Sequence, residues 1–382
     1  MDLSYCTNVH PAETLDGVIA QLHRYAGPIR RRAGLARLGV GLWLPAALAR
    51  ELATDEHARG RLRDALDAES LEVRTLNAFP YAAFHADVVK HDVYRPDWTT
   101  AERERYTLDC AAVLADLLPE GATGSISTLP LGWREPWGPE QDRLAMDALT
   151  RVSRVLGGIR SELGRTIRLA IEPEPGCVLD DVGDIARWLG PRVGHGGIDA
   201  EHVGVCLDTC HLAVSFADPA RAVDEVLDAG LRVVKVQASA ALHADDPADP
   251  ATADALGAFA EPRYLHQTRL RAPGGEVVRA DDLDLALSEL PRTGPWRTHF
   301  HMPLHHPAPA PLATTTDVLE AAYRAVLAGP GGGDDVQLDV ETYTWSVLDV
   351  GDDDLIAGVA GELAWVRRHL LGASDLPGEA VA

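Results

Sequence analysis

Five short apolar stretches of the sequence end in carboxylate, imidazole, amide or amine side chains. Each stretch has the length and composition of one strand that is buried on both faces, as in a parallel sheet. They are 167–172 with Glu172, 203–211 with Asp208 and His211, 231–237 with Lys235 and Gln237, 296–301 with His299 and His301, and 336–341 with Glu341. Because α/β barrels carry their chemistry at the carboxyl ends of their strands, these endings together indicate one shared site.

Carboxylate and imidazole donors that converge on one point are typical of a divalent metal site. The predicted ligands are Glu172, Asp208, His211, Gln237, His299, His301 and Glu341. Zinc, manganese or iron is favoured over magnesium, because imidazole is among the donors. Two alternatives stay open around Asp208: its carboxylate also suits a helix cap, and Cys206 or Cys210 beside it would offer a thiolate ligand. The simpler interpretation of all the cysteines is as small buried apolar residues.

Two of the predicted ligands also suit proton transfer. Glu172 and Glu341, on opposite sides of a bound hydroxy-ketone, would remove and return a proton next to its carbonyl. Lys235 is the third predicted catalytic residue, placed to meet a hydroxyl or a phosphate. The predicted substrate contacts are Asn77, Phe79, Tyr81, His85, Trp133, His211, Arg263, His266 and Trp345. Several of them lie in the aromatic stretch 77–98, a connection so long that a functional role is expected.

The strands that must position these residues alternate with helical patterns, which predicts a parallel sheet with right-handed crossovers. Eight such units predict a (β/α)8 TIM barrel. The expected strands are 3–8, 37–44, 71–76, 124–129, 167–172, 203–208, 231–237 and 336–341. A ninth candidate, 296–301, is interpreted as an extended strand over the barrel mouth.

The segment between the last two expected barrel strands is too long for a simple connection. We predict an insertion at about 239–297 that contains an added strand or hairpin at 263–267. A single barrel domain is expected over 1–371, and residues 372–382 are expected to form a flexible tail.

Composition limits the possible partners. The 382 residues are 46% hydrophobic, enough for a sizeable core, and carry a net charge of −23. Such a negative field repels nucleic acid, so a small molecule is the expected partner. No apolar stretch has the length and freedom from charge needed to span a bilayer, and the first residues lack the pattern of a signal peptide. The expected location is therefore the cytoplasm.

Three of the strand-end motifs resemble the signature of the xylose isomerase-like barrels. They are Ile-Glu-Pro at 171–173, Asp-Thr-Cys-His at 208–211, and Glu341. That superfamily contains sugar isomerases, ketose 3-epimerases, inosose dehydratases and endonuclease IV-type nucleases. The resemblance implies that Glu172, Asp208 and Glu341 are the metal ligands on strands five, six and eight.

The same resemblance gives roles to the remaining polar residues. His211 matches a histidine that binds substrate in the epimerases and a second metal in the nucleases. Gln237 departs from the pattern, because the superfamily places a ligand histidine there. The pair His299 and His301 is similar to the Asp-x-His of the nucleases. One metal is expected on this basis, and a second stays open.

A more specific resemblance, to the EboE family of bacterial "metabolite traffic" proteins, runs from about residue 3 to residue 365. It is carried by the stretches 75–81, 125–133, 172–176, 261–267 and 341–345. Membership would imply secondary metabolism and a gene cluster with a sugar-phosphate-cyclase-like partner and a prenyltransferase-like membrane protein.

Three functions follow as hypotheses. The first is a metal-dependent isomerase or epimerase, or a related dehydratase, that acts on a sugar or cyclitol through proton abstraction next to a carbonyl. The second is a metabolite-binding or traffic protein without catalysis, which would keep the pocket but need no acid–base pair. The third is an endonuclease IV-like phosphoester hydrolase, against which the negative charge and the lack of a basic stripe argue.

Overall fold

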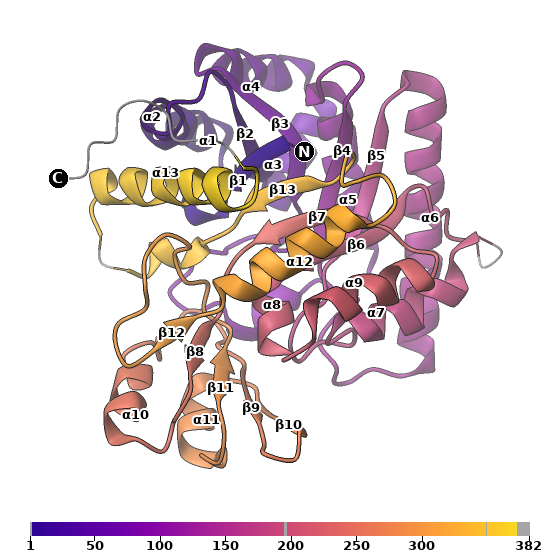
Figure 1. Cartoon of the computed structure of the whole chain (residues 1–382). Helices are drawn as coiled ribbons and strands as arrows, with labels where there is room; N and C mark the ends of the chain where they lie inside the picture. Colours follow the sequence, from indigo (N-terminus) through magenta and orange to yellow (C-terminus); the bar gives the residue numbers. More distant parts are fainter. Residues whose placement is uncertain (1, 195–196, 349, 373–382) are drawn as a thin grey trace.

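Eight parallel strands form a closed barrel in the computed structural model, which describes residues 2–194, 197–348 and 350–372 (Figure 1). They are β1 (Asp2–Cys6), β2 (Leu38–Trp43), β3 (Leu71–Asn77), β4 (Thr123–Thr128), β5 (Thr166–Ile171), β6 (Val203–Asp208), β7 (Val233–Ala238) and β13 (Gln337–Val340). Their order around the barrel is β1-β13-β7-β6-β5-β4-β3-β2. The predicted TIM barrel is therefore confirmed, with each strand within two residues of its expected place.

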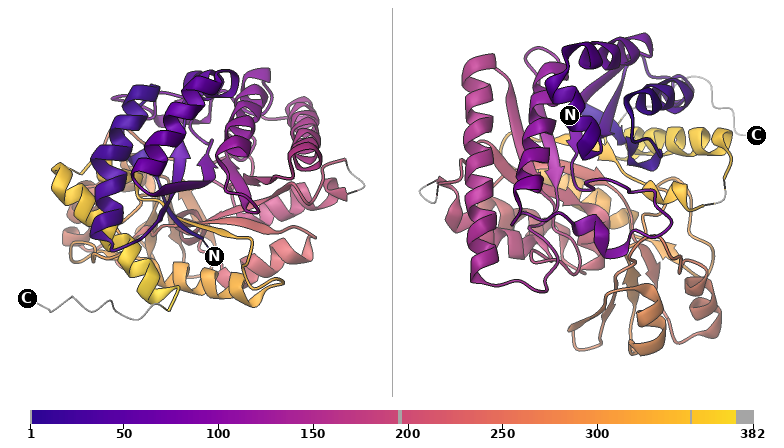
Figure 2. Two further views of the ribbon diagram at one scale, coloured as in Figure 1. Left: turned by 90° about the horizontal axis from the view of Figure 1, so that it is seen from above. Right: turned by 180° about the vertical axis from the view of Figure 1, so that it is seen from behind.

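Helices surround the barrel on its outside, as the view from above shows (Figure 2, left). Those before β6 are α1 (Leu15–Gln21), the π-helical turn η2 (Leu22–Ala26), α2 (Gly27–Arg32), α3 (Ala46–Thr54), α4 (Glu56–Ala68), α5 (Ala101–Leu117), α6 (Pro139–Leu163) and α7 (Val182–Leu189). Those after it are α8 (Thr209–Val214), α9 (Pro219–Asp228), α12 (Thr316–Ala328) and α13 (Asp352–His369). None of the described helices is long and apolar enough to cross a membrane.

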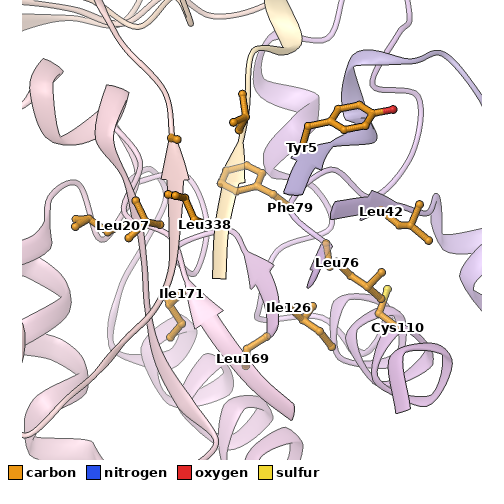
Figure 3. Packing of buried hydrophobic residues seen from close by; sticks show 14 of the residues in the cluster. Tyr5, Leu42, Leu76, Phe79, Cys110, Ile126, Leu169, Ile171, Leu207 and Leu338 are labelled. Atoms are coloured by element: carbon orange, nitrogen blue, oxygen red, sulfur yellow. The ribbon is translucent and has the colours of Figure 1, made fainter. Parts of the chain in front are cut away.

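Apolar side chains at alternate strand positions form the layer between the barrel and its helices. Leu169, Ile171, Leu207 and Leu338 are fully buried in this layer, which Figure 3 shows from close by. The barrel interior, by contrast, is polar. Lys235 on β7 lies 3.4 Å from the hydroxyl of Ser127 on β4, although β7 and β4 are not neighbours in the sheet. The same alternation that places apolar residues outward therefore sends polar residues toward the barrel axis.

The insertion between β7 and α12 forms a second sheet, antiparallel, in the order β10-β9-β11-β8-β12. Its elements are β8 (Leu242–Ala244), α10 (Pro250–Gly257), β9 (Thr268–Arg271), β10 (Val277–Ala280), α11 (Leu283–Glu289), β11 (Trp296–Thr298) and β12 (Ala313–Thr314). Trp296 lies at the centre of its separate apolar core. The predicted ninth strand is thus β11, outside the barrel as expected. Two details differ: the sheet continues to Thr314, beyond 297, and the hairpin begins at Thr268 rather than within 263–267.

Ion pairs connect this insertion to loops at the carboxyl end of the barrel. Lys90 pairs with Asp282 at 2.5 Å, and Arg134 pairs with Asp281 at 2.5 Å. The insertion lies below the barrel in Figure 1, on the side where the barrel strands end. It is therefore placed to contribute to any site at that end. The predicted flexible tail, residues 372–382, lies outside the described residues except for Gly372.

Candidate functional site

Three carboxylates from separate strands meet at the carboxyl end of the barrel. Glu172 follows β5, Asp208 ends β6 and Glu341 follows β13, and all three are at least 96% buried. One oxygen of each lies within 4.8 Å of the others. Asp208 also caps α8, because its Oδ1 accepts hydrogen bonds from the backbone N–H groups of Cys210 and His211. The capping alternative for Asp208 is thus confirmed without removing Asp208 from the cluster.

Gln237 presents its amide nitrogen to all three carboxylates. Nε2 donates to Glu172 Oε1 at 3.1 Å, to Asp208 Oδ2 at 3.0 Å and to Glu341 Oε2. The amide oxygen points away from them and lies 3.0 Å from the thiol of Cys206. A metal ligand would need the opposite orientation, with the oxygen toward the carboxylates. Gln237 therefore lies at its predicted place, but here it acts as a donor to the cluster.

Two further amides hold Glu341. Its Oε1 accepts hydrogen bonds from Nδ2 of Asn8 at 2.8 Å and from Nδ2 of Asn77 at 2.9 Å. Asn77, predicted as a substrate contact, lines the cavity but uses a donor on this carboxylate. Glu341 is thereby fixed in one orientation.

Three histidines present their Nε2 atoms beside this cluster. His211 Nδ1 lies 2.8 Å from the carbonyl oxygen of Pro173, and His301 Nδ1 lies 2.8 Å from that of Glu341. His299 Nδ1 lies 2.7 Å from Oε1 of Gln267. Because an acceptor fixes the proton on each Nδ1, each neutral ring has its lone pair on Nε2.

These Nε2 atoms lie close together. Those of His211 and His299 are 3.1 Å apart, and that of His301 is buried without a hydrogen-bond partner among the described residues. His299 and His301 come from the insertion and face the same way, as their spacing predicts. A buried imidazole with an unused lone pair is the form in which histidine binds a metal ion.

Glu174 is a member of the site to which the sequence argument gave no role. Its Oε2 lies 3.0 Å from Nε2 of His211, and its Oε1 accepts a hydrogen bond from the hydroxyl of Tyr94 at 2.9 Å. Glu174, His211 and His299 offer ligand atoms within 4.8 Å of one another. The available signal was the spacing, since Glu174 follows Glu172 by two residues and both face the cavity.

Burial and mutual repulsion dominate the electrostatics of the carboxylates. Burial raises the pKa of Glu172 well above its usual value, and the charge of Glu341 raises it further. Burial likewise raises the pKa of Glu341, with the charge of Asp208 adding to the effect. Burial alone would lower the pKa of His211, but Asp208, Glu174 and Glu172 outweigh it and raise that pKa to about 9.

The two histidines of the insertion respond in the opposite direction. Burial lowers the pKa of His299 well below its usual value, and the neighbouring His211 lowers it further. Burial lowers the pKa of His301 to about 4. Both rings are therefore neutral near pH 7, which is the form that binds metals.

The donor set fits a divalent ion. Three buried carboxylates this close repel one another unless a cation lies among them. Glu172 Oε2 is buried without a hydrogen-bond partner among the described residues, as is Nε2 of His301. Cys210 forms a further group with His299 and His301, so the thiolate alternative keeps a geometric basis. All of the cysteines are free and buried, as the simpler interpretation predicts.

A small cavity of about 60 Å³ opens above these groups. Predicted residues that line it are Asn77, Phe79, Glu172, His211, His299, His301 and Glu341, and the lining residues not predicted include Asn8, Glu174, Tyr94, Tyr264 and Tyr343. Asp208 and Gln237 lie beneath this lining and contact it through the hydrogen bonds described above. The lining combines a polar floor with aromatic walls.

Apart from Asp208 and Gln237, seven predicted residues do not line this cavity, and the first four are Lys235, Tyr81, Trp133 and His266. Lys235 is buried in the barrel interior, where its Nζ pairs with Asp339 at 2.8 Å. Tyr81 packs against Tyr106, with 5.2 Å between ring centroids. Trp133 stacks behind Tyr94. His266 is fully buried between the carbonyl of His299 and the carboxylate of Glu261.

These residues lie close to the site along the chain, but their side chains point away from the cavity. Lys235 points into the barrel like Gln237, but it lies one layer deeper, beside an acidic partner on β13. The aromatic loop folds back so that Tyr81 faces α5 while Phe79 faces the cavity. The remaining three predicted residues, His85, Arg263 and Trp345, line a second cavity.

No protein-family model and no curated protein matches the sequence. Solved structures do. A candidate xylose isomerase from Rhodospirillum rubrum is 12% identical, with 98% of this chain and 100% of that chain covered and a TM-score of 0.53. The IolI protein with a bound zinc atom is 12% identical, with 97% and 99% covered and a TM-score of 0.50.

A candidate sugar phosphate isomerase/epimerase from Anabaena variabilis is 16% identical, with 97% of this chain and 98% of that chain covered and a TM-score of 0.50. At such low identity the comparison identifies the fold alone. Together with the closed parallel barrel and its strand order, it shows that this chain has the xylose isomerase-like TIM-barrel fold.

Proposed function

We propose that this protein is a metal-dependent isomerase or epimerase, or a related dehydratase, that acts on a sugar or cyclitol. The observation that carries the proposal is the pair Glu172 and Glu341. They come from strands separated in the barrel by β6 and β7, and both line one cavity. Two carboxylates that reach one pocket from different strands suit the removal of a proton from one face of a substrate and its return to another.

The local chemistry supports proton transfer at these oxygens. A raised pKa makes a carboxylate a stronger base, and its protonated form is then available as an acid near neutral pH. Asn8, Asn77 and Gln237 hold the Glu341 carboxylate, so its orientation is set before a ligand arrives. Phe79, Tyr94 and Tyr343 offer apolar surfaces to a ring and exclude water.

The metal is part of the proposal. Glu172, Asp208 and Glu341 would hold one ion, and rotation of the Gln237 amide would bring its oxygen toward that ion. His211, His299 and His301 extend the donor set, which favours zinc, manganese or iron over magnesium. A bound divalent ion supplies polarisation of the substrate carbonyl and stabilisation of negative charge on its oxygen. The names of the similar structures, which include sugar isomerases and a zinc-binding protein, agree with this proposal.

A second candidate is a metabolite-binding protein without catalysis. The observation that favours it is the Gln237 nitrogen, which occupies the space between the carboxylates as a donor. This role agrees with the EboE-type resemblance of the sequence.

We extend the proposal to secondary metabolism, to the cytoplasm, and to partners encoded in the same gene cluster.

The test begins with a thermal-shift screen of ketoses, cyclitols and their phosphates in the presence of manganese or zinc. Each compound that stabilises the protein is then incubated with it, and nuclear magnetic resonance follows the stereochemistry. The proposal expects slow formation of an epimer or isomer, lost in Glu172→Gln and kept in Glu104→Gln, a matched change on the outer helix α5. Stabilising ligands that all remain unchanged would instead support the carrier.

A further inference from the structure

A second cavity, of about 340 Å³, lies directly behind one wall of the first. Neighbours in sequence line opposite sides of this wall: Phe84, Tyr264 and Tyr343 face the first cavity, and His85, Arg263 and Trp345 face the second. The wall is continuous, because the Phe84 and Tyr264 rings lie 5.0 Å apart and the Tyr264 and Tyr343 rings lie 4.9 Å apart. The second cavity is therefore a separate compartment.

Tyr25, which also lines this cavity, comes from an unusual turn. The chain forms a single π-helical turn at Leu22–Ala26, a conformation that is frequent at functional sites. It places the Tyr25 ring parallel to the buried ring of His10, with 4.4 Å between centroids and 8° between planes. The Tyr25 hydroxyl donates to Asp352 at 2.8 Å. Tyr25 is thereby held as a rigid surface.

Three residues that line this cavity each have a buried polar atom without a hydrogen-bond partner among the described residues. The atoms are Nδ1 of His10, Nε2 of His85 and Nε of Arg263. His10 is 1% exposed, and its other ring nitrogen lies 3.2 Å from the hydroxyl of Tyr5. Unpaired buried polar atoms cost free energy, so several of them on one cavity indicate a missing partner.

The charge of the cavity identifies the kind of partner. Among the described residues that line it, one carries a carboxylate, Asp352, which is already paired with Arg24. Arg263 forms no ion pair among the described residues. Its guanidinium lies over the Tyr264 ring, 6.0 Å from the centroid, and its Nη1 donates to the carbonyl oxygen of Ser346 at 3.4 Å. A guanidinium without an ion-pair partner attracts an anion at short range, although the net charge of −23 repels anions at a distance. Leu348 and Leu355 add apolar surface beside it.

We propose that this second cavity binds a small organic anion, a ring or chain that carries a carboxylate or phosphate. Arg263 contacts the oxyanion, the histidine nitrogens contact its hydroxyl groups, and Trp345 with Tyr25 contacts its apolar part. The site is independent of the metal cluster, because the aromatic wall separates the two.

Isothermal titration calorimetry tests this with three probes of similar shape. 4-Hydroxybenzoate and phenyl phosphate carry the two oxyanions, and 4-hydroxybenzamide is the uncharged control. We expect one site per chain for at least one anion, and binding of the amide at least about tenfold weaker. The anion that binds more tightly shows whether the site prefers a carboxylate or a phosphate.

Variants locate the site. Arg263→Met should weaken anion binding at least about tenfold, and Arg263→Lys should weaken it less, because the charge remains. Arg279→Met removes an exposed arginine of the insertion, outside this cavity, and should change nothing. Glu172→Gln should also leave anion binding intact, so failure of the proposed catalysis is distinguishable from failure here. Two results would overturn the proposal. One is that neither anion binds saturably to the wild type; the other is that Arg263→Met binds the anion as tightly as the wild type and has the same melting temperature.

Discussion

The amide nitrogen of Gln237 lies 3.0 Å from Oδ2 of Asp208, at the centre of a buried carboxylate cluster. A neutral donor thus holds together groups that repel one another when ionised. The same side chain can offer its oxygen to a metal after rotation about its last bond, which exchanges the two ends of the amide. Gln237 is therefore suited to stabilise the site both with and without metal.

Gln237→Leu tests this double role. In the metal-free protein the change removes the amide that donates to three buried carboxylates, so the free energy of unfolding should fall by about 1–3 kcal/mol. With saturating manganese the loss should be smaller, because the ion replaces the missing donors. Urea unfolding with and without metal gives both values. An equal loss in the two states would show that Gln237 acts only through packing.

The purified protein should carry a bound divalent ion. The expectation rests on the orphaned Glu172 Oε2 and His301 Nε2 atoms beside three buried carboxylates. Metal analysis after gel filtration should find at least one equivalent, and Asp208→Asn should lower it strongly. Less than about a tenth of an equivalent, with none regained on dialysis against zinc or manganese, would contradict the site.

The positions of Glu172, Asp208 and Glu341 were predictable because each follows or ends a short apolar run, which is the sequence pattern of a buried parallel strand. The spacing of His299 and His301 also placed both rings on one face correctly. Glu174 was missed because its two-residue spacing from Glu172 lies in a loop, where spacing alone does not fix the direction of a side chain. Its role depends on Tyr94 and His211, which distant parts of the chain bring to it.

The direction of side chains in loops was also not predictable. His85, Arg263 and Trp345 were expected around the substrate together with Phe79. The fold places the first three behind the aromatic wall and Phe79 in front of it. Adjacent residues in a loop point in different directions according to tertiary packing, which no local pattern encodes.

Lys235 should prove structural. Its ion pair with Asp339 is fully buried, and removal of one partner of such a pair costs about 3–5 kcal/mol. Lys235→Met should therefore lower the free energy of unfolding by about that amount. The double variant Lys235→Met, Asp339→Leu should recover most of it. If the single variant folds with unchanged stability but loses catalysis, Lys235 is catalytic after all.

Glu362 on α13 should make the stability of the protein depend on pH. Its buried carboxylate accepts hydrogen bonds from Thr342 at 2.6 Å and Trp345 at 2.9 Å, which follow Glu341. Burial raises its pKa to about 7 from an ordinary 4.5, against these hydrogen bonds. A raised folded-state pKa contributes stability that is complete below pH 4.5 and is lost as the pH rises through about 7.

The matched variant is Glu362→Gln, which cannot titrate. Between pH 5 and pH 8 the wild type should lose about 1–3 kcal/mol more unfolding free energy than this variant. Chemical denaturation across the pH range measures the difference. Parallel pH profiles for the two proteins would show that Glu362 does not titrate in this interval.

Glu341→Gln in deuterium oxide tests the proposed proton transfer most directly. The metal-loaded wild type, given a ketose or cyclitol from the thermal-shift screen, should place deuterium on the carbon next to the carbonyl. Glu341→Gln keeps the size and one oxygen donor but removes the base, so it should bind the same ligand and show no exchange. Wild-type protein that binds its metal and ligand tightly yet exchanges no hydrogen would contradict the enzyme and favour the carrier.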